Sequence, residues 1–420
     1  MPPAPGAARA GPPAAPRLRT QAGWALAGNL FYAASQWLVL VVLAKAANAS
    51  AVGQLTYALA VTAPVVMLLG LQLRSVLATD VGGTYLLADY ARLRLVTSVL
   101  ALLVIAGLAV AGPAEHAGLV LAAGLAKSVE AVGDLLGGAM QRDERMGAAA
   151  GALFVKGTLG LASFAAALLL GGSLLAAVLA QAAAWAVTSL AYDVPVATRG
   201  RPALLVGGSL RPARLAALAR TSLPLGVAMA LISWNVNVPR YFVERFSGSV
   251  ALGLYGGVAY LFVAGSMVVS AVGQAVTPRL ARHALEGDRT GFLRLTALIC
   301  AGGAGLGLLG VAVAALAGRQ LLELLYSAEY AGAEGLLVAC ALVAVAQFTL
   351  SGLGIAATAA RSFRAQLPVL AAGLAVTAAG SAWLVPAHGA LGAVWATGLS
   401  TLVQLAGYAP LVRAGARRPA

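Results

Sequence analysis

The stretch LPLGVAMALISWNVNVPRYFVERFSGSVALGLYGGVAYLFVAG, residues 223–265, holds two apolar runs with a polar segment, NVNVPRYFVERF at 235–246, between them. A helix rises about 1.5 Å per residue, so about 20 apolar residues cross a hydrocarbon core of about 30 Å. We therefore interpret the stretch as parts of two membrane spans, 221–241 and 250–276, with the polar segment at the outer end of the first.

Similar apolar windows recur along the whole chain. Hydrophobic residues make up 60% of the 420 residues, charged residues only 10%, and the mean hydropathy is +0.88. This composition excludes an ordinary soluble domain and predicts an all-α integral membrane protein, because backbone groups in lipid must be paired within each helix. We predict twelve transmembrane helices, at 24–44, 53–78, 94–114, 117–140, 147–170, 173–197, 221–241, 250–276, 292–317, 331–355, 365–385 and 389–411.

Basic residues orient these spans. With the N-terminus inside, the cytoplasmic segments hold 22 of the 28 basic residues, Arg94 at the start of the third span among them. The outer segments hold only Lys45, Arg240, Arg245 and Arg319. This asymmetry follows the positive-inside rule and predicts the cytoplasmic membrane with both termini cytoplasmic. The net charge of +14 is then spread over loops that face membrane lipids, so we expect no nucleic-acid partner.

An arginine-rich amphipathic segment near the middle divides the chain into six spans and six spans. It is expected to lie on the inner membrane surface, near anionic lipid. The predicted units are a disordered cytoplasmic N-terminus 1–22, an N-lobe 23–198, a cytoplasmic linker 199–221, a C-lobe 222–412 and a cytoplasmic tail 413–420.

A weak internal repeat supports the division into lobes. The segment 44–60 aligns with 244–260 and places Gly53 over Gly253. Because six spans return the chain to the same side, the two halves would be parallel repeats, related by an axis along the membrane normal.

Charged residues inside the spans are the candidate functional residues. Lys127, Glu130 and Asp134 share one face of the fourth span, and Lys156 lies near the middle of the fifth. Intramembrane ionisable groups are costly, so we expect these four to line a polar cavity. In the alternative interpretation they are structural ion pairs, Lys127 with Glu130 and Lys156 with a nearby carboxylate. Glu130 and Asp134, as neighbouring carboxylates, could also couple transport to H+ or Na+.

Other motifs predict no chemistry. GLGLLG at 305–310 lies inside a span, where small residues allow helices to pack closely. The three histidines fall in different loops on both sides of the membrane, so we expect no metal site, and Cys300 and Cys340 within spans indicate no disulfide. No catalytic cluster occupies a large aqueous loop, which argues against an enzyme, and we expect no organic cofactor.

Four segments together resemble the oligosaccharide flippases of the multidrug/oligosaccharidyl-lipid/polysaccharide exporter (MOP) superfamily. They are QRDERMGAAA at 141–150, the polar segment with the span that follows it, TPRLARHALEGD at 277–288 and LLELLYSAEYAGAEGLL at 321–337. The resemblance implies a MATE-like architecture of two six-helix lobes. It also implies alternating access that moves a polyprenyl-pyrophosphate-linked oligosaccharide, a precursor of surface polysaccharide in the cell envelope, across the membrane.

The resemblance gives the polar residues their expected roles. Lys127 and Lys156 would line the substrate cavity, and Asn235, Asn237 and Arg240 would lie near its outer mouth, where Pro239 kinks or ends the helix. Alternatively, Arg240 snorkels to the interface beside Glu244. Expected partners are the lipid-linked oligosaccharide, membrane lipids and other polysaccharide-assembly proteins. The alternatives are a cation-coupled multidrug exporter of the same superfamily and, less favoured, a membrane-embedded enzyme of glycan assembly.

Overall fold

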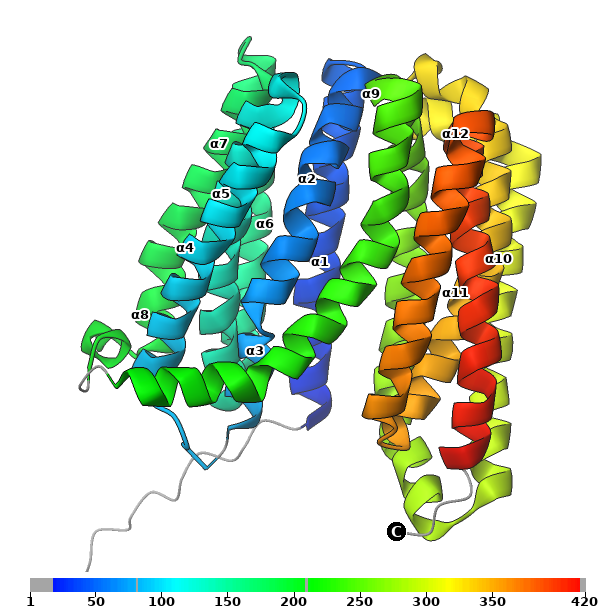
Figure 1. The fold of residues 1–420 in the computed structure, drawn as a ribbon. Coiled ribbons are helices and arrows are strands. Elements are labelled where there is room, and N and C mark those ends of the chain that lie inside the picture. The colour runs from blue at the N-terminus through cyan, green and yellow to red at the C-terminus, as the bar shows by residue number, and fades with distance from the viewer. Residues whose placement is uncertain (1–17, 81, 208–210, 416–420) are drawn as a thin grey trace, which may run out of the picture.

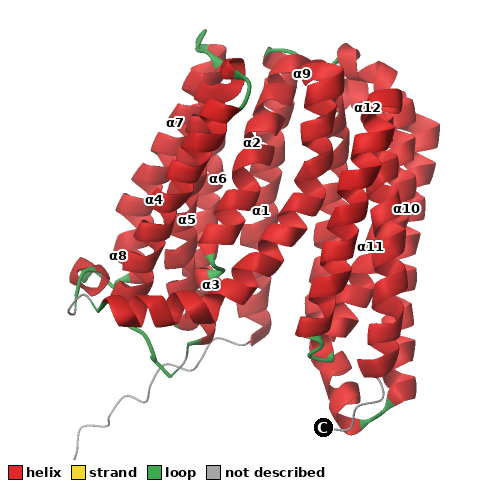
Figure 2. Cartoon of the chain, in the orientation of Figure 1, coloured by secondary structure: helices red, strands yellow, loops and turns green. Residues whose placement is uncertain are grey.

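The computed structural model describes residues 18–80, 82–207 and 211–415, and within these ranges it contains helices, turns and loops but no strands (Figure 2). The helices are α1 (Leu18–Ala46), α2 (Ala49–Gly70), α3 (Leu73–Thr79), α4 (Leu87–Ala111), α5 (Ala114–Arg142), α6 (Met146–Leu169), α7 (Leu174–Thr188), a π-helical segment (Ser189–Asp193), α8 (Val194–Ala197), a 3₁₀ turn (Pro202–Leu205), α9 (Pro212–Glu286), α10 (Arg289–Leu325), a second 3₁₀ turn (Ala328–Ala333), α11 (Glu334–Ala359) and α12 (Phe363–Gly415).

The number of membrane passages agrees with the prediction. Among the described residues, 9 helical stretches are long and apolar enough to cross a membrane. Two of them, in α9 and α12, contain two passages each, because the chain reverses at Gly248 and Gly389, whose φ angles of 78° and 56° suit glycine. The α5 helix, whose central charges lower its hydropathy, completes the predicted twelve.

Several boundaries differ from the prediction. The α1 helix begins at Leu18, so residues 18–22 are helical rather than part of a disordered lead, and the prediction for 1–17 lies outside the described residues. At the other end α12 continues to Gly415, inside the predicted tail. The α4 helix begins at Leu87, seven residues before the predicted start at Arg94, which moves Arg94 from the membrane surface into the helix.

The helices form two bundles, the N-lobe (α1 to α8) and the C-lobe (α9 to α12), as Figure 1 shows. The first turns of α9 lie across the lower end of the N-lobe before the helix bends upward (Figure 1). There Arg214 approaches Asp89 at 3.1 Å and Leu218 is completely buried. The later part of the predicted linker is thus an amphipathic helix, as expected, but it continues directly into the seventh span.

The polar segment that interrupts the apolar sequence is helical. Pro239 lies inside α9, and the helix continues beyond it to the break at Gly248. Of the two predicted effects of Pro239, a kink or the end of the helix, the second is therefore wrong. A proline removes only one backbone donor, and the Nδ2 group of Asn237 bonds to the carbonyl of Ser233 in the preceding turn (2.8 Å), which adds a local contact there.

The two lobes cross most closely at the two glycines of the proposed repeat. A Cβ atom on Gly53 would lie 1.8 Å from the carbonyl oxygen of Ser249, and one on Gly253 would lie 1.8 Å from that of Ala49. The two contacts are reciprocal, because Gly253 follows Gly53 by 200 positions and Ser249 follows Ala49 by the same 200. This is the geometry expected where a two-fold axis relates parallel repeats.

Candidate functional site

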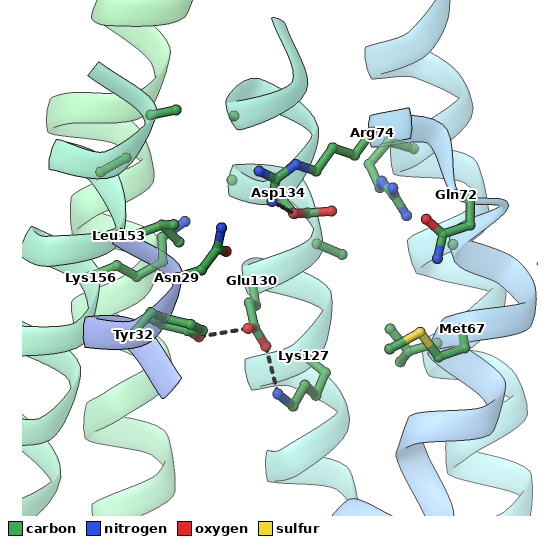
Figure 3. A pocket seen from close by; sticks show the side chains of 18 of the residues that line it. Asn29, Tyr32, Met67, Gln72, Arg74, Lys127, Glu130, Asp134, Leu153 and Lys156 are labelled. Atoms are coloured by element: carbon green, nitrogen blue, oxygen red, sulfur yellow. Dashed lines mark hydrogen bonds and ion pairs between the residues drawn. The ribbon is translucent and has the colours of Figure 1, made fainter. Parts of the chain in front are cut away.

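A cavity of about 400 Å³ opens inside the N-lobe, lined by residues of α1 to α6. Figure 3 shows that polar side chains from several helices converge on it. Its lining contains four cationic and two anionic side chains, which are Arg74, Arg94, Lys127, Lys156, Glu130 and Asp134. All four charged residues predicted to share a cavity therefore line it.

Lys127 and Glu130 form one ion pair in this cavity. The Lys127 ammonium lies 2.7 Å from Glu130 Oε2, and the Tyr32 hydroxyl donates to Glu130 Oε1 at 2.6 Å (Figure 3). The same ammonium lies 5.8 Å from the centroid of the Trp185 ring. Both members of the pair remain partly exposed, at 29% and 22%, so a ligand in the cavity can reach them.

Lys156 forms a second pair, and this one is buried. Its Nζ atom lies 2.9 Å from Asp193 Oδ2, which also accepts a hydrogen bond from Ser189 at 3.1 Å. The exposed fractions of the Lys156 and Asp193 side chains are 4% and 0%. Ser189 and Asp193 are the ends of the π-helical segment, a local widening of the helix that is frequent at functional sites.

Asp134 is separated from Glu130 by its own partner. Arg74 of α3 donates to Asp134 Oδ1 at 2.7 Å. The two carboxylates predicted as one like-charge pair are thus held in two different ion pairs. Each negative charge is therefore compensated by its own basic partner, and the two carboxylates do not form a like-charge pair.

Sequence reasoning missed three charged members of this site, which are Arg74, Arg94 and Asp193. Asp193 lies 37 positions from Lys156, so no local spacing connects them. Arg94 was placed at the cytoplasmic surface, whereas it is only 4% exposed and lines the cavity. The sequence feature that could have indicated Arg94 as a cavity residue follows Tyr90, where Arg92 and Arg94 alternate with leucines at the start of a span.

A second cavity, of about 270 Å³, lies in the C-lobe. Asn235 and Arg240 line it, so they lie in a different cavity from Lys127 and Lys156 rather than at the mouth of a shared one, and Asn237 is not among the residues that line either. Asn237 instead accepts a hydrogen bond from Arg240 Nη1 at 2.9 Å and so helps to hold the guanidinium in place. Asn235 accepts hydrogen bonds from Thr377 and Ser400.

Glu244 is not the partner of Arg240. Its carboxylate lies 2.9 Å from Nε2 of His116, in the N-lobe, and accepts a hydrogen bond from Ser249 at 2.6 Å. His116 is buried and Glu244 is largely shielded, with 4% and 9% of their side chains exposed. The alternative in which Arg240 snorkels beside Glu244 therefore loses its partner, and the position of Arg240 in the cavity lining favours the binding role.

The lobes are held together at the end predicted to be outside. Besides the His116 contact, Glu329 accepts from the backbone N–H of Ala49 (2.8 Å), and the Tyr241 hydroxyl donates to the carbonyl of Ala60 (2.6 Å). Together with the glycine crossing, these contacts close the interface between the lobes on that side.

The described part of the chain contains neither an assembled metal site nor a disulfide. It contains no group of three or more His, Cys, Asp or Glu side chains placed to hold a metal ion. Cys300 and Cys340 are free thiols.

Comparison with known proteins places this geometry in context. Residues 18–283 match the family model described as "Polysaccharide biosynthesis protein". The capsular polysaccharide biosynthesis protein CapF of Staphylococcus aureus is 24% identical over 386 residues, which cover 90% of this chain and 95% of that protein.

Two solved structures share the fold. The lipid II flippase MurJ in an inward closed conformation aligns with a TM-score of 0.69 at 10% identity, covering 91% of this chain and 85% of that one. An inward-facing multidrug resistance MATE family transporter of the MOP superfamily aligns with a TM-score of 0.66 at 15% identity, covering 95% and 96%. These alignments confirm the predicted two-lobed MATE-like architecture.

Proposed function

The chain belongs to the polysaccharide biosynthesis protein family, and from this premise we propose that it flips a polyprenyl-pyrophosphate-linked oligosaccharide across the membrane. It is a multi-pass helical membrane protein. We place it in the cytoplasmic membrane with both termini inside, because the basic residues favour that orientation. Flipping would be a transport step, with the lipid-linked glycan, membrane lipids and other polysaccharide-assembly proteins as partners.

The observation that carries the proposal is the charged cavity of the N-lobe. Four cations and two carboxylates line it, at a depth where a single charge costs about 3 kcal/mol even on lenient insertion scales. An excess of cations suits an anionic cargo. A pyrophosphate linked to a sugar is such a cargo, and capsule precursors are the chemistry that the related CapF protein suggests.

Alternating access follows from how the lobes meet. At the expected outer end the lobes are joined by the glycine crossing and by the His116–Glu244 contact, while the first turns of α9 also pack on the N-lobe at the opposite end. The head group would enter from the cytoplasmic side, occupy the cavities and leave once these outer contacts break. The prenyl tail would remain in lipid at the seam between the lobes, since burial of so long an apolar chain inside a polar cavity would be unfavourable.

A cation-coupled multidrug exporter remains the second candidate, because the MATE transporter shares the fold. Glu130 and Asp134 supply the carboxylates that such a mechanism needs, yet both are neutralised by basic partners. A cavity with more cations than anions would repel the cationic drugs that a multidrug exporter carries. The charge balance therefore favours the flippase.

A cellular experiment tests the proposed function. The gene is deleted from its host, and lipid-linked oligosaccharide and surface polysaccharide are both quantified. We expect lipid-linked precursor to accumulate on the inner leaflet and surface glycan to fall at least tenfold, with recovery when the wild-type chain is expressed. Unchanged surface glycan together with increased sensitivity to cationic drugs would support the multidrug exporter instead.

A further inference from the structure

One of the four cationic side chains that line the N-lobe cavity, an arginine, has no carboxylate partner among the described residues. The other three have carboxylate partners, namely Arg74 with Asp134, Lys127 with Glu130 and Lys156 with Asp193. Arg94 forms no ion pair with any described residue. Asp134, the carboxylate whose charge acts on it, is already bound by Arg74.

Arg94 is also short of hydrogen-bond partners. The residue is 4% exposed, and its buried Nε atom has no partner among the described residues. A guanidinium carries five N–H donors in a planar fork that fits phosphate oxygens, and a buried cation without a counter-ion is strongly unfavourable. This combination indicates that Arg94 is positioned for an anion that enters the cavity.

The C-lobe cavity also contains an arginine without a carboxylate partner in the described part of the chain, but the polar groups around that arginine are neutral. Arg240 is the one charged side chain among the described residues that line it, and its buried Nε also lacks a partner. The other polar groups around it are neutral hydroxyls and amides, which include Asn235, Gln347, Thr397, Thr401 and Gln404. Such groups are suited to sugar hydroxyls, and the arginine to the adjoining anion.

The two arginines differ in depth. Arg94 lies seven residues after Leu87, the start of α4 at the expected cytoplasmic end, or about 10 Å along the axis. Arg240 lies eight residues before Gly248, where α9 reverses at the expected outer end, or about 12 Å along it. One uncompensated cation therefore stands on the inner side of the transport path and one on the outer side, each in a different lobe.

We propose that Arg94 and Arg240 are successive binding sites for the anionic diphosphate of the lipid-linked substrate, Arg94 on entry and Arg240 before release. This inference rests on the proposed function and refines it. The paired lysines keep the path polar without binding the anion permanently. Transfer from one lobe to the other places the cargo on the outer side before the outer contacts open.

The test measures binding and flipping separately on the full-length protein in lipid nanodiscs and proteoliposomes. The probe is a fluorescent polyprenyl diphosphate. Arg94→Gln should weaken binding at least tenfold. Arg240→Gln should leave binding within about threefold of wild type but reduce flipping at least tenfold. Equal binding by wild type and Arg94→Gln, or normal flipping by Arg240→Gln, would overturn the relay.

Matched controls remove an arginine from the same helix without touching either cavity. Arg92→Gln changes α4 two residues from Arg94, where the guanidinium bonds to the carbonyl of Val206 at 2.7 Å. Arg245→Gln changes the exposed arginine at the end of the seventh span, beside Phe246. Both should bind and flip within about threefold of wild type. Losses as large as those of the cavity variants would mean that general surface charge, rather than the two sites, is responsible.

A variant that is expected to bind more tightly provides a further control, because a misfolded protein would lose binding rather than gain it. Asp134→Asn releases Arg74, so two uncompensated arginines then face the cavity, and binding of the polyprenyl diphosphate should tighten several-fold. Arg94→Lys should retain part of the binding that Arg94→Gln loses. If Asp134→Asn binds no more tightly, the cavity does not select anions by charge and the proposal fails.

Competition identifies the ligand class. Inorganic diphosphate should displace the probe, whereas vesicles of phosphatidylglycerol should not, because a single phosphodiester offers fewer oxygens to the guanidinium. Equal displacement by phosphatidylglycerol would mean an anionic-lipid site and overturn the assignment. Failure of the wild-type chain itself to bind and flip would instead contradict the proposed flippase function, so the two failures are distinguishable.

Discussion

At the residue scale, spacing along one helix was informative and pairing between helices was not. Lys127 and Glu130 are three positions apart, and neighbours on one helical turn meet whatever the rest of the fold does. The partner of Lys156 was expected only as a nearby carboxylate. Asp193 supplies it through tertiary packing of α6 against the π-helical segment, which no sequence period reveals.

Lys127 provides the first residue-scale prediction. Lys127→Gln removes a partly exposed cation but keeps a polar side chain, so membrane abundance should stay within about twofold while surface glycan falls at least fivefold. Immunoblotting of membranes and quantification of capsule or similar glycan measure both. Glu130→Gln is the control, since it breaks the same pair yet leaves the cation in place. Equal loss in both variants would indicate that the pair is only structural.

Lys156 should behave differently because its pair is buried. Lys156→Gln leaves the Asp193 carboxylate without a counter-ion, and breaking a buried pair costs about 3–5 kcal/mol. We expect a marked drop in thermal stability, measured by fluorescence-detected size exclusion after heating. The double variant Lys156→Gln with Asp193→Asn should recover most of that stability. No recovery would show that Lys156 contributes through contacts other than the pair.

At the element scale, hydrophobic periods located the membrane helices and turn chemistry decided where they end. Pro239 is predicted to kink or end the helix near 241, yet the helix continues to Gly248, where a φ of 78° that excludes most other residues reverses the chain. Hydropathy likewise placed Arg94 at the first residue of the third span, at the membrane surface. The helix extends seven residues further, since charged side chains that line a polar cavity escape the penalty that lipid would impose.

The crossing of α2 and α9 yields an element-scale prediction. Gly53→Ala would place a methyl group 1.8 Å from the Ser249 carbonyl, so the closed outer interface should be destabilised. A cysteine at Thr397, which lines the C-lobe cavity, should then react severalfold faster with an impermeant thiol reagent added outside, in a background lacking Cys300 and Cys340.

The matched control is a glycine in an open environment. A Cβ atom on Gly302 of α10 would meet no atom within 4 Å, so Gly302→Ala should leave the labelling rate unchanged. Identical labelling of the Gly53→Ala and Gly302→Ala proteins would show that the crossing does not control the outer interface.

At the scale of the whole molecule, twelve spans in two lobes could be read from composition and charge, because lipid leaves so few options for the backbone. The two glycines aligned by the repeat, Gly53 and Gly253, lie where the lobes cross, a contact that the repeat alone did not predict. What the sequence could not supply is which charged groups from different helices meet in a cavity. That depends on rotation and register of six helices at once.

The orientation of the whole molecule is tested by cysteine labelling. Arg282 and Glu323 are exposed at opposite ends of the C-lobe helices. In intact cells lacking the native cysteines, Glu323→Cys should react with an impermeant thiol reagent and Arg282→Cys should react only after permeabilisation. The reverse pattern would invert the topology, and with it the assignment of entry and release sides.

Reconstituted flipping tests the central claim most directly. The purified chain is placed in proteoliposomes with a fluorescent polyprenyl-pyrophosphate-linked oligosaccharide, and a membrane-impermeant quencher reports the fraction exposed on the outer leaflet over time. We predict that transbilayer movement is at least tenfold faster than in protein-free liposomes and is lost on Arg240→Gln. Movement no faster than in protein-free liposomes, with the chain folded and correctly inserted, would contradict the flippase assignment.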